Sequence, residues 1–311
     1  MLRVEHLIKH VRRQTDNESL GTDAGLSDEE IIRYLNDAQE DAFGGIVNTF
    51  RSKFYDQATD SIVAGQESYD VPSKAFMGDQ LALVEWSITG QDRDYRALKR
   101  VTFRERTTSE GWPCRYAVSN GKIYIWPIPQ AAQGTLRITY TKKRPKLDKR
   151  RAMVDTVTIV GGAITALTVK GSDGAALGSA EGDAFTNDDY MTIINSSGDI
   201  LCEGIGYDSV SVGGVVTITG GSHTLQSGET CPQDSYVVLG KWATTQPQLP
   251  DDLEKYLLAH TAWAVYRRDS NTDQTPQLQA LAAMKADILD NYAEMNLDID
   301  YTPQVNDTYD W

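Results

Sequence analysis

The chain has 311 residues, of which 40% are hydrophobic and 24% charged, and its net charge at pH 7 is −14. The length suits two domains or one large one, and the composition is that of an ordinary soluble protein. The excess of acid argues against a nucleic-acid binder that relies on phosphate contacts, because such proteins are usually basic. No run of about 18 apolar residues is present, so we expect no transmembrane helix and no membrane partner.

The negative charge is concentrated in two segments. Residues 152–236 contain eleven acids and one base, and residues 297–311 contain four acids and no base. The remaining chain is therefore neutral. The three cysteines are widely separated, which favours free thiols in a reducing cytoplasm, with a Cys202–Cys231 bridge as the alternative.

Two helices are predicted at the start of the chain. The first, within residues 1–14, is basic and amphipathic, and it lacks the apolar block and cleavage site of a signal peptide. The second spans Ser27–Phe50, where Ser27 and Glu30 form a capping box. Its apolar residues recur every three or four positions, and its polar face carries Arg33, Asn36, Glu40 and Asp41. Gly44-Gly45 predicts an end, a bend or a closely packed neighbouring backbone.

Strands and turns dominate the next hundred residues. We expect strands near Ile62–Val71, at Gln80–Thr89 and at Gly134–Thr141, whereas residues 97–107 fit a short helix or a strand edge equally well. Asn120-Gly121 between two alternating segments predicts a β-hairpin with a type I′ turn.

A basic run follows at residues 142–151, with seven bases and one acid. It fits either a solvated linker at a domain edge, which we favour, or a contact with DNA phosphate or another anion. The residues proposed for such a contact are Lys142, Lys143, Arg144, Lys149, Arg150 and Arg151.

Residues 152–236 predict an inserted β domain. They hold fourteen of the 25 glycines, and Gly-containing turns separate short apolar runs. This spacing is typical of a small antiparallel sandwich, including an immunoglobulin-like one, or of a barrel. Helices are expected again from Pro250 to about Arg268 and from near Pro276 to Met295, followed by an acidic tail.

Residues suited to catalysis or metal binding are few. His6 and His10 have the spacing of two metal ligands but no third ligand is apparent, and His260 fits a packed core position. Oxygen ligands for calcium are clustered at Asp183, Asn187, Asp188 and Asp189, without EF-hand spacing. No phosphate loop or nucleophile elbow is found. We therefore expect no enzyme activity, cofactor or metal.

Several short motifs, in their order along the chain, resemble a known family. They are ESYDVP, LVEW, GWPCRY, IYIWPIP, RITYTKKRP and LPDDLEKYLLAHTAWAVY. Together they resemble the head-to-tail adaptor, or connector, proteins of tailed bacteriophages, over residues 1–147 and 249–311. Residues 152–236 depart from that pattern.

The resemblance implies a virion protein made in the host cytoplasm and placed at the head-tail junction. It implies a ring, typically of twelve copies, that binds the portal and a tail tube or nozzle protein and passes double-stranded DNA without sequence-specific binding during genome ejection. Residues 152–236 could dock tail fibres or other tail proteins. The C-terminal tail could enter the portal, with Tyr301, Tyr309 and Trp311 as aromatic anchors.

These expectations combine into an α+β protein. Residues 1–151 and 237–296 would form a base of bundled helices with strand elements, residues 152–236 the inserted β domain, and residues 297–311 an extended tail. In a ring, Arg33, Glu40 and Asp41 would face a neighbouring subunit. The alternative is a host-surface or carbohydrate-binding module on a helical stem, and a cell-wall hydrolase ranks below both because no acid/base or nucleophile set is present.

Overall fold

The computed structural model describes residues 3–15, 26–50, 54–76, 81–106, 111–177, 185, 189–219, 223–225, 230–233, 235–247, 253–269 and 275–294. It has both helices and strands, which confirms the α+β class. The chain divides into two compact units, residues 46–143 and residues 1–45 with 144–311. No helix within the described ranges is long and apolar enough to cross a membrane.

Residues 46–143 fold into two packed sheets. The first has the order β1 (Tyr55–Ser61), β8 (Thr135–Thr141), β3 (Leu81–Ser87) and β4 (Arg96–Ala97). The second has the order β2 (Ser68–Asp70), β7 (Lys122–Trp126), β6 (Arg115–Ser119) and β5 (Lys99–Arg100). Their facing side chains, among them Tyr69, Val84, Ile123, Leu136 and Ile138, form one buried apolar cluster. The two sheets therefore share a core.

A tight turn, a register shift and two short helices shape this unit. Asn120 and Gly121 both have positive φ, as a type I′ turn requires, and they join β6 to β7 as predicted. In β3 the register shifts between Leu81 and Leu83, so the inward face changes along the strand. The ambiguous residues 97–107 contain β5 and a 3-10 helix, η3 (Phe103–Glu105); another, η2, spans Asp92–Asp94.

The other unit contains a β-barrel. Of the folds predicted for residues 152–236, a sandwich or a barrel, the strands thus form the barrel. Its strands are β10 (Ala152–Val160), β16 (Tyr236–Leu239), β12 (Tyr190–Ile194), β13 (Ile200–Val210), β14 (Val215–Ile218) and β11 (Ala163–Gly171). Because β10 also pairs with β11, the sheet closes on itself, where a sandwich or an immunoglobulin-like fold would have two separate sheets. β15 (His223–Thr224) adds to β11.

Two short strands lie at the ends of the barrel segment. β9 (Lys146–Leu147) precedes the barrel in sequence and β17 (Ala243–Thr244) follows it, and the two pair in parallel. The chain thus enters and leaves the barrel side by side. The last barrel strand, β16, extends to Leu239, beyond the predicted limit at residue 236.

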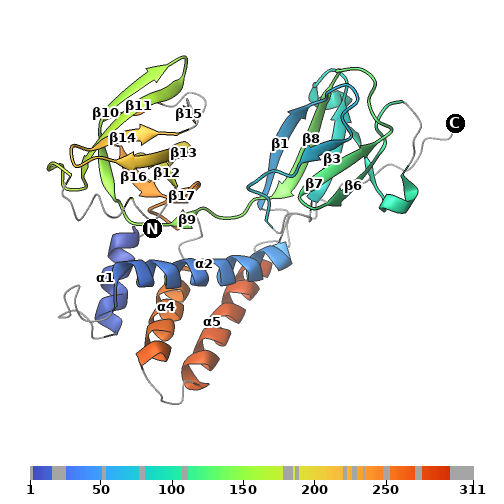
Figure 1. Ribbon diagram of the computed structural model, residues 1–311. Coiled ribbons are helices and arrows are strands. Elements are labelled where there is room, and N and C mark those ends of the chain that lie inside the picture. Colours follow the sequence, from blue (N-terminus) through green and yellow to red (C-terminus); the bar gives the residue numbers. More distant parts are fainter. Residues whose placement is uncertain are drawn as a thin grey trace. The chain divides into compact units, whose positions relative to one another are not determined.

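Among the described residues, the helices of this unit are α1 (Val4–Gln14), most of α2 (Asp28–Phe50), α4 (Glu254–Asp269) and α5 (Thr275–Glu294). In Figure 1, α1, α4 and α5 lie in a row along α2. The buried face of α1 (Val4, Leu7, Ile8 and Val11) packs in one cluster with Ile31, Ile32 and Leu35 of α2, Leu147 and Val265. The predicted apolar stripes of α1 and α2 are confirmed.

The Gly44-Gly45 pair does not end α2, which continues to Phe50. A Cβ atom on Gly45 would lie 2.9 Å from Cε of Lys285, whereas one on Gly44 would meet nothing within 4 Å. The close neighbour is therefore a side chain of α5, where the sequence had suggested a backbone. The division between the two compact units falls at Gly45 and Ile46.

Candidate functional site

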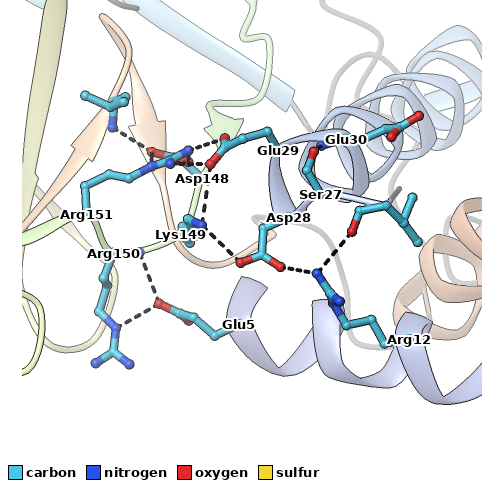
Figure 2. Close-up of polar contacts among 12 residues, drawn as sticks. Glu5, Arg12, Ser27, Asp28, Glu29, Glu30, Asp148, Lys149, Arg150 and Arg151 are labelled. Carbon is cyan, nitrogen blue, oxygen red and sulfur yellow. Dashed lines mark hydrogen bonds and ion pairs between the residues drawn. The ribbon is translucent and has the colours of Figure 1, made fainter. Parts of the chain in front are cut away.

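A charged cluster joins the barrel to both ends of α1 and to the N-terminal end of α2, and it contains half of the predicted anion-contact residues (Figure 2). Four bases meet four acids in it, so its formal charge is zero. Its members are Arg12, Lys149, Arg150 and Arg151 with Glu5, Asp28, Glu29 and Asp148. We call these eight residues the charged cluster.

Arg151 and Asp148 form its buried centre. The two side chains are 8% and 6% exposed, and a guanidinium nitrogen of Arg151 lies 2.6 Å from the carboxylate of Asp148. Asp148 also accepts a hydrogen bond of 2.7 Å from the Leu239 amide of β16. Arg151 donates a further bond of 2.6 Å to Glu29 in the first turn of α2. One base therefore connects the barrel entrance to a helix.

Lys149 and Arg150 extend the cluster to both helices. The ammonium nitrogen of Lys149 lies 3.0 Å from the Asp28 carboxylate, and a guanidinium nitrogen of Arg12 in α1 lies 2.8 Å from the same carboxylate. Arg150 donates to Glu5 of α1 at 2.8 Å, and its guanidinium carbon lies 4.8 Å from the centre of the Tyr236 ring. Each of the three last bases of the run is thus paired within the chain.

The pKa values follow from burial and these partners. The hydrogen bond from Arg151 is the largest effect on Glu29 and holds its pKa below the ordinary value. Burial raises the pKa of Asp28, but Lys149 and Arg12 outweigh burial and leave that pKa lowered. Burial raises the pKa of Asp148, against the opposing effects of Arg151 and the Leu239 amide. The two helix acids are accordingly held ionised.

Amide side chains of α2 support the cluster from the side. Asn36 bonds the backbone of Leu147 twice, accepting from its N–H at 2.8 Å and donating to its C=O at 2.9 Å. Gln39, which is buried, donates to the Pro145 C=O at 2.9 Å. These bonds satisfy backbone groups of Leu147 in β9 and of Pro145 just before it, which are buried. Asn36 was predicted to lie on an outward polar face of the helix, and this prediction is wrong.

The N-terminus of α2 differs in one respect from the predicted capping box. Ser27 accepts from the Glu30 amide at 3.2 Å, which is the expected cap. The Glu30 carboxylate, expected to return to the Ser27 backbone, accepts hydrogen bonds from Tyr34 and from Arg268 of α4. Glu30 therefore links two helices.

The remaining residues of the basic run are placed separately. Lys142 pairs with Asp56 at 2.9 Å within the unit of residues 46–143, where Lys143 is exposed. Arg144 lies over the Phe43 ring at 5.0 Å in the other unit. The favoured solvated linker does not describe Lys149, Arg150 and Arg151, which are paired with acids. A role in anion contact stays a prediction.

The predicted subunit-interface residues differ in their surroundings. Arg33 and Glu40 are exposed on α2. Asp41 contacts its own chain, accepting from the Tyr256 hydroxyl of α4 and from Lys285 of α5 at 2.8 Å. These bonds connect α2 to both late helices. Tyr301, Tyr309 and Trp311 lie outside the described residues, and so does the rest of the predicted tail.

The structure also shows where several of the candidate histidines, metal ligands and cysteines lie. His260 lies half-buried between the rings of Tyr256 and Trp263, as its predicted core position requires, and burial lowers its pKa. His6 and His10 are exposed, and no group of three metal-ligand side chains occurs in the part of the chain that the structure describes. Asp183, Asn187 and Asp188 fall outside that part. All three cysteines are free, with Cys202 and Cys231 buried.

The acids of the charged cluster were not predicted as site residues. A signal existed, because the three consecutive acids Asp28, Glu29 and Glu30 could complement the bases near residue 150. Their sequence separation of over 100 residues hides the pairing until the barrel entrance is placed beside α1 and α2.

Comparison with known proteins identifies one family. The model of the SU10 adaptor protein family matches residues 3–162, about half of the chain, whereas no curated protein matches it. The matched residues include α1, α2, the unit of residues 46–143 and all eight residues of the charged cluster. The chain therefore belongs to the SU10 adaptor protein family, a family of virion-associated adaptor proteins of bacteriophages.

Proposed function

We propose that this protein joins the portal to the tail as a head-to-tail adaptor, with copies forming a ring, of twelve by resemblance, around a central passage for DNA. The observation that carries this proposal is the family match over residues 3–162. The protein acts as a structural component without catalytic turnover. Its partners are the portal on one side and a tail tube or nozzle protein on the other.

The helices α1, α2, α4 and α5 form the base of this ring in our proposal. Two features support such a role. The apolar cluster of α1, α2 and α4 gives the base its own core, and the charged cluster fastens that base to the barrel. A ring subunit must hold its parts together between its partners, and Arg151 can contribute to this because its buried guanidinium pairs with both Asp148 and Glu29 of α2.

Portal binding tests this function directly. The purified protein, mixed with the portal of the phage that encodes it, should give ring complexes by electron microscopy. Removal of residues 297–311 should weaken binding at least about tenfold if the aromatic tail residues are anchors. Val212→Ser, at an exposed barrel turn, is the control that should bind normally. A full-length protein that never binds portal would overturn the adaptor function, and unchanged binding without the tail would overturn the tail's role alone.

DNA passes through the ring without sequence-specific binding in this proposal. The net charge of −14 and the zero charge of the cluster support a passage that does not retain phosphate. Fluorescence anisotropy with a short duplex should show no binding at physiological salt. Tight binding that Lys143→Ala and Lys149→Ala remove would contradict the proposal and revive the predicted anion contact.

The barrel is proposed to dock tail fibres or other tail proteins. Val160, at the turn between β10 and β11, and Val212, at the turn between β13 and β14, are 63% and 74% exposed, and because the two turns lie at opposite ends of β11 each is a separate candidate contact. Val160→Asp should reduce recovery of tail proteins with the adaptor while leaving portal binding intact. Unchanged recovery with that variant and with Val212→Asp would contradict this role.

A further inference from the structure

The sheet β2-β7-β6-β5 carries two bases side by side on its outer face. Lys99 of β5 lies beside Arg115 of β6, and Arg115 lies beside Trp126 of β7. Residues paired in this way direct their side chains to the same face of a sheet, so the two bases are neighbours. The other face of the sheet, which includes Tyr116 and Ile125, belongs to the apolar core.

The short helix η3 extends this outer face. The ring of Phe103 packs edge-on against the rings of Tyr124 and Trp126, at 5.0 and 5.4 Å between ring centres, and stays 44% exposed. Arg104 is exposed beside it, and Arg115 donates a hydrogen bond of 3.4 Å to a backbone carbonyl of η3. We call this surface the basic face; its members are Lys99, Phe103, Arg104, Arg115 and Tyr124.

The bases of the basic face differ from their neighbours in their partners. Arg106 after η3 and Lys122 of β7 pair with acids at 3.3 and 3.6 Å. Among the described residues, by contrast, no acid pairs with any of the three bases of the basic face. The acid next to them in sequence, Glu105, accepts a hydrogen bond of 3.2 Å from the Thr102 amide. The basic face therefore keeps an excess of positive charge.

Protection of a sheet edge does not account for this arrangement. Charged residues on an edge strand such as β5 prevent it from pairing with another chain, which explains Lys99 alone. Arg115 lies on β6, which is paired on both sides. Because like charges side by side destabilise a sheet, the two adjacent bases indicate an anionic partner.

The acidic segment at residues 297–311 has the chemistry that fits this face. Residues 46–143 contain fourteen bases and ten acids, although the chain as a whole has a net charge of −14. Residues 297–311 contain four acids, no base and three aromatic residues. The carboxylates would pair with the bases, and the aromatic rings would pack on Phe103 and on the arginine guanidinium groups.

We propose that the basic face binds residues 297–311 of this chain. A DNA backbone fits less well, because three unpaired bases are few beside the roughly six to ten phosphate contacts of a protein that binds DNA tightly. The portal site proposed above uses the same segment, so the basic face and the portal are alternative sites for it. The contact itself does not need the adaptor function, whereas this alternation rests on it.

Photocrosslinking in the full chain tests the contact. Benzoylphenylalanine replaces Phe103, and mass spectrometry identifies the crosslinked peptides after illumination. At least about fivefold more product should map to residues 297–311 than with the same probe at Tyr55, because only Phe103 lies among unpaired bases. Tyr55 is a matched control, since it is an aromatic residue of the other sheet and is 45% exposed. Equal yields at the two positions would overturn the proposal.

Fluorescence anisotropy gives a second, independent measurement. A labelled peptide of residues 297–311 is titrated with the chain that lacks them, which keeps every described residue. Lys99→Glu and Arg104→Glu should each weaken binding by at least about fivefold, because an acid then faces the acidic peptide. Lys143→Glu, which reverses an exposed base elsewhere in the same unit, should change it by less than about twofold.

Two results of this titration would contradict the proposal. One is an equal effect of all three substitutions with each variant folded by circular dichroism. Lys99→Glu places an acid beside Arg115, so its folding is not at risk. The other is a basic face that binds a short DNA duplex at physiological salt but not the peptide.

These results are separable from the proposed function. Crosslinks from position 103 to residues 297–311 in a protein that does not bind portal would reject the adaptor function and keep this contact. Portal binding that depends on residues 297–311, without such crosslinks in the free protein, would reject this contact and keep the function.

Discussion

The sandwich of residues 46–143 and the unit that contains the barrel are both rich in β-structure, but they are held together differently. The sandwich is built from one continuous stretch of chain, and its sheets share a single apolar cluster. The other unit is assembled from distant segments. Its barrel and helices meet through ion pairs, hydrogen bonds of side-chain amides and apolar contacts. Apolar burial is little affected by pH or by charge screening in dilute salt, whereas partly exposed charge pairs respond to both.

The largest effect is expected in the sandwich core. Leu136→Ala removes a fully buried side chain and should lower the free energy of unfolding by about 3 kcal/mol. Urea unfolding measures the loss, and hydrogen exchange should assign it to residues 54–143. Leu136→Met, of similar volume, should cost less than about 1.5 kcal/mol. A loss that changes strongly with salt would break the contrast between the two units.

The buried centre of the charged cluster should give the next effect. Asp148→Asn keeps the shape but removes a carboxylate from Arg151, so we expect a loss of about 2 kcal/mol in the barrel-and-helix unit. Lys142→Met is the matched control, because its pair with Asp56 is 39% and 38% exposed and should contribute less than about 0.5 kcal/mol. Equal effects of the two changes by urea unfolding would show that burial does not distinguish them.

The boundary between the units offers a gain in stability. Gly44→Ala introduces a Cβ into open space in α2 and should raise the free energy of unfolding by about 0.5 to 1 kcal/mol. Gly45→Ala should give little or no gain, because its Cβ would displace Lys285 from Asp41. Thermal unfolding of the pair measures the difference. A loss with Gly44→Ala would mean that α2 needs flexibility there.

The smallest effect concerns pH. Because the pKa of Glu29 is lowered in the folded state, its pairing stabilises the fold above its ordinary pKa of 4.5, and this contribution is lost as pH falls through the folded value. Glu29 is 57% exposed, so solvent screening limits the effect to below about 1 kcal/mol. Glu29→Gln should flatten the stability curve between pH 6 and about pH 3. An identical curve for the variant would remove Glu29 from the acid response.

Local sequence pattern by itself determined the elements whose signals lie within a few residues. The apolar stripes of α1 and α2, the Asn120-Gly121 hairpin and the apolar runs of β10 to β14 were predictable, because helix and strand periods and turn chemistry act over short distances. The order of the short motifs also indicated the adaptor family, and the family match confirms it.

Only the tertiary structure decided how these elements combine. Whether β10 to β16 close into a barrel depends on the pairing of β10 with β11 and β16 at once. Lys149, Arg150 and Arg151 each have an acidic partner over 100 residues away in α1 or α2, so this pairing depends on where the fold brings the chain back. The sequence specified a basic run. The tertiary fold brings acids of α1 and α2 to its last three bases, so the junction between helices and barrel is neutral.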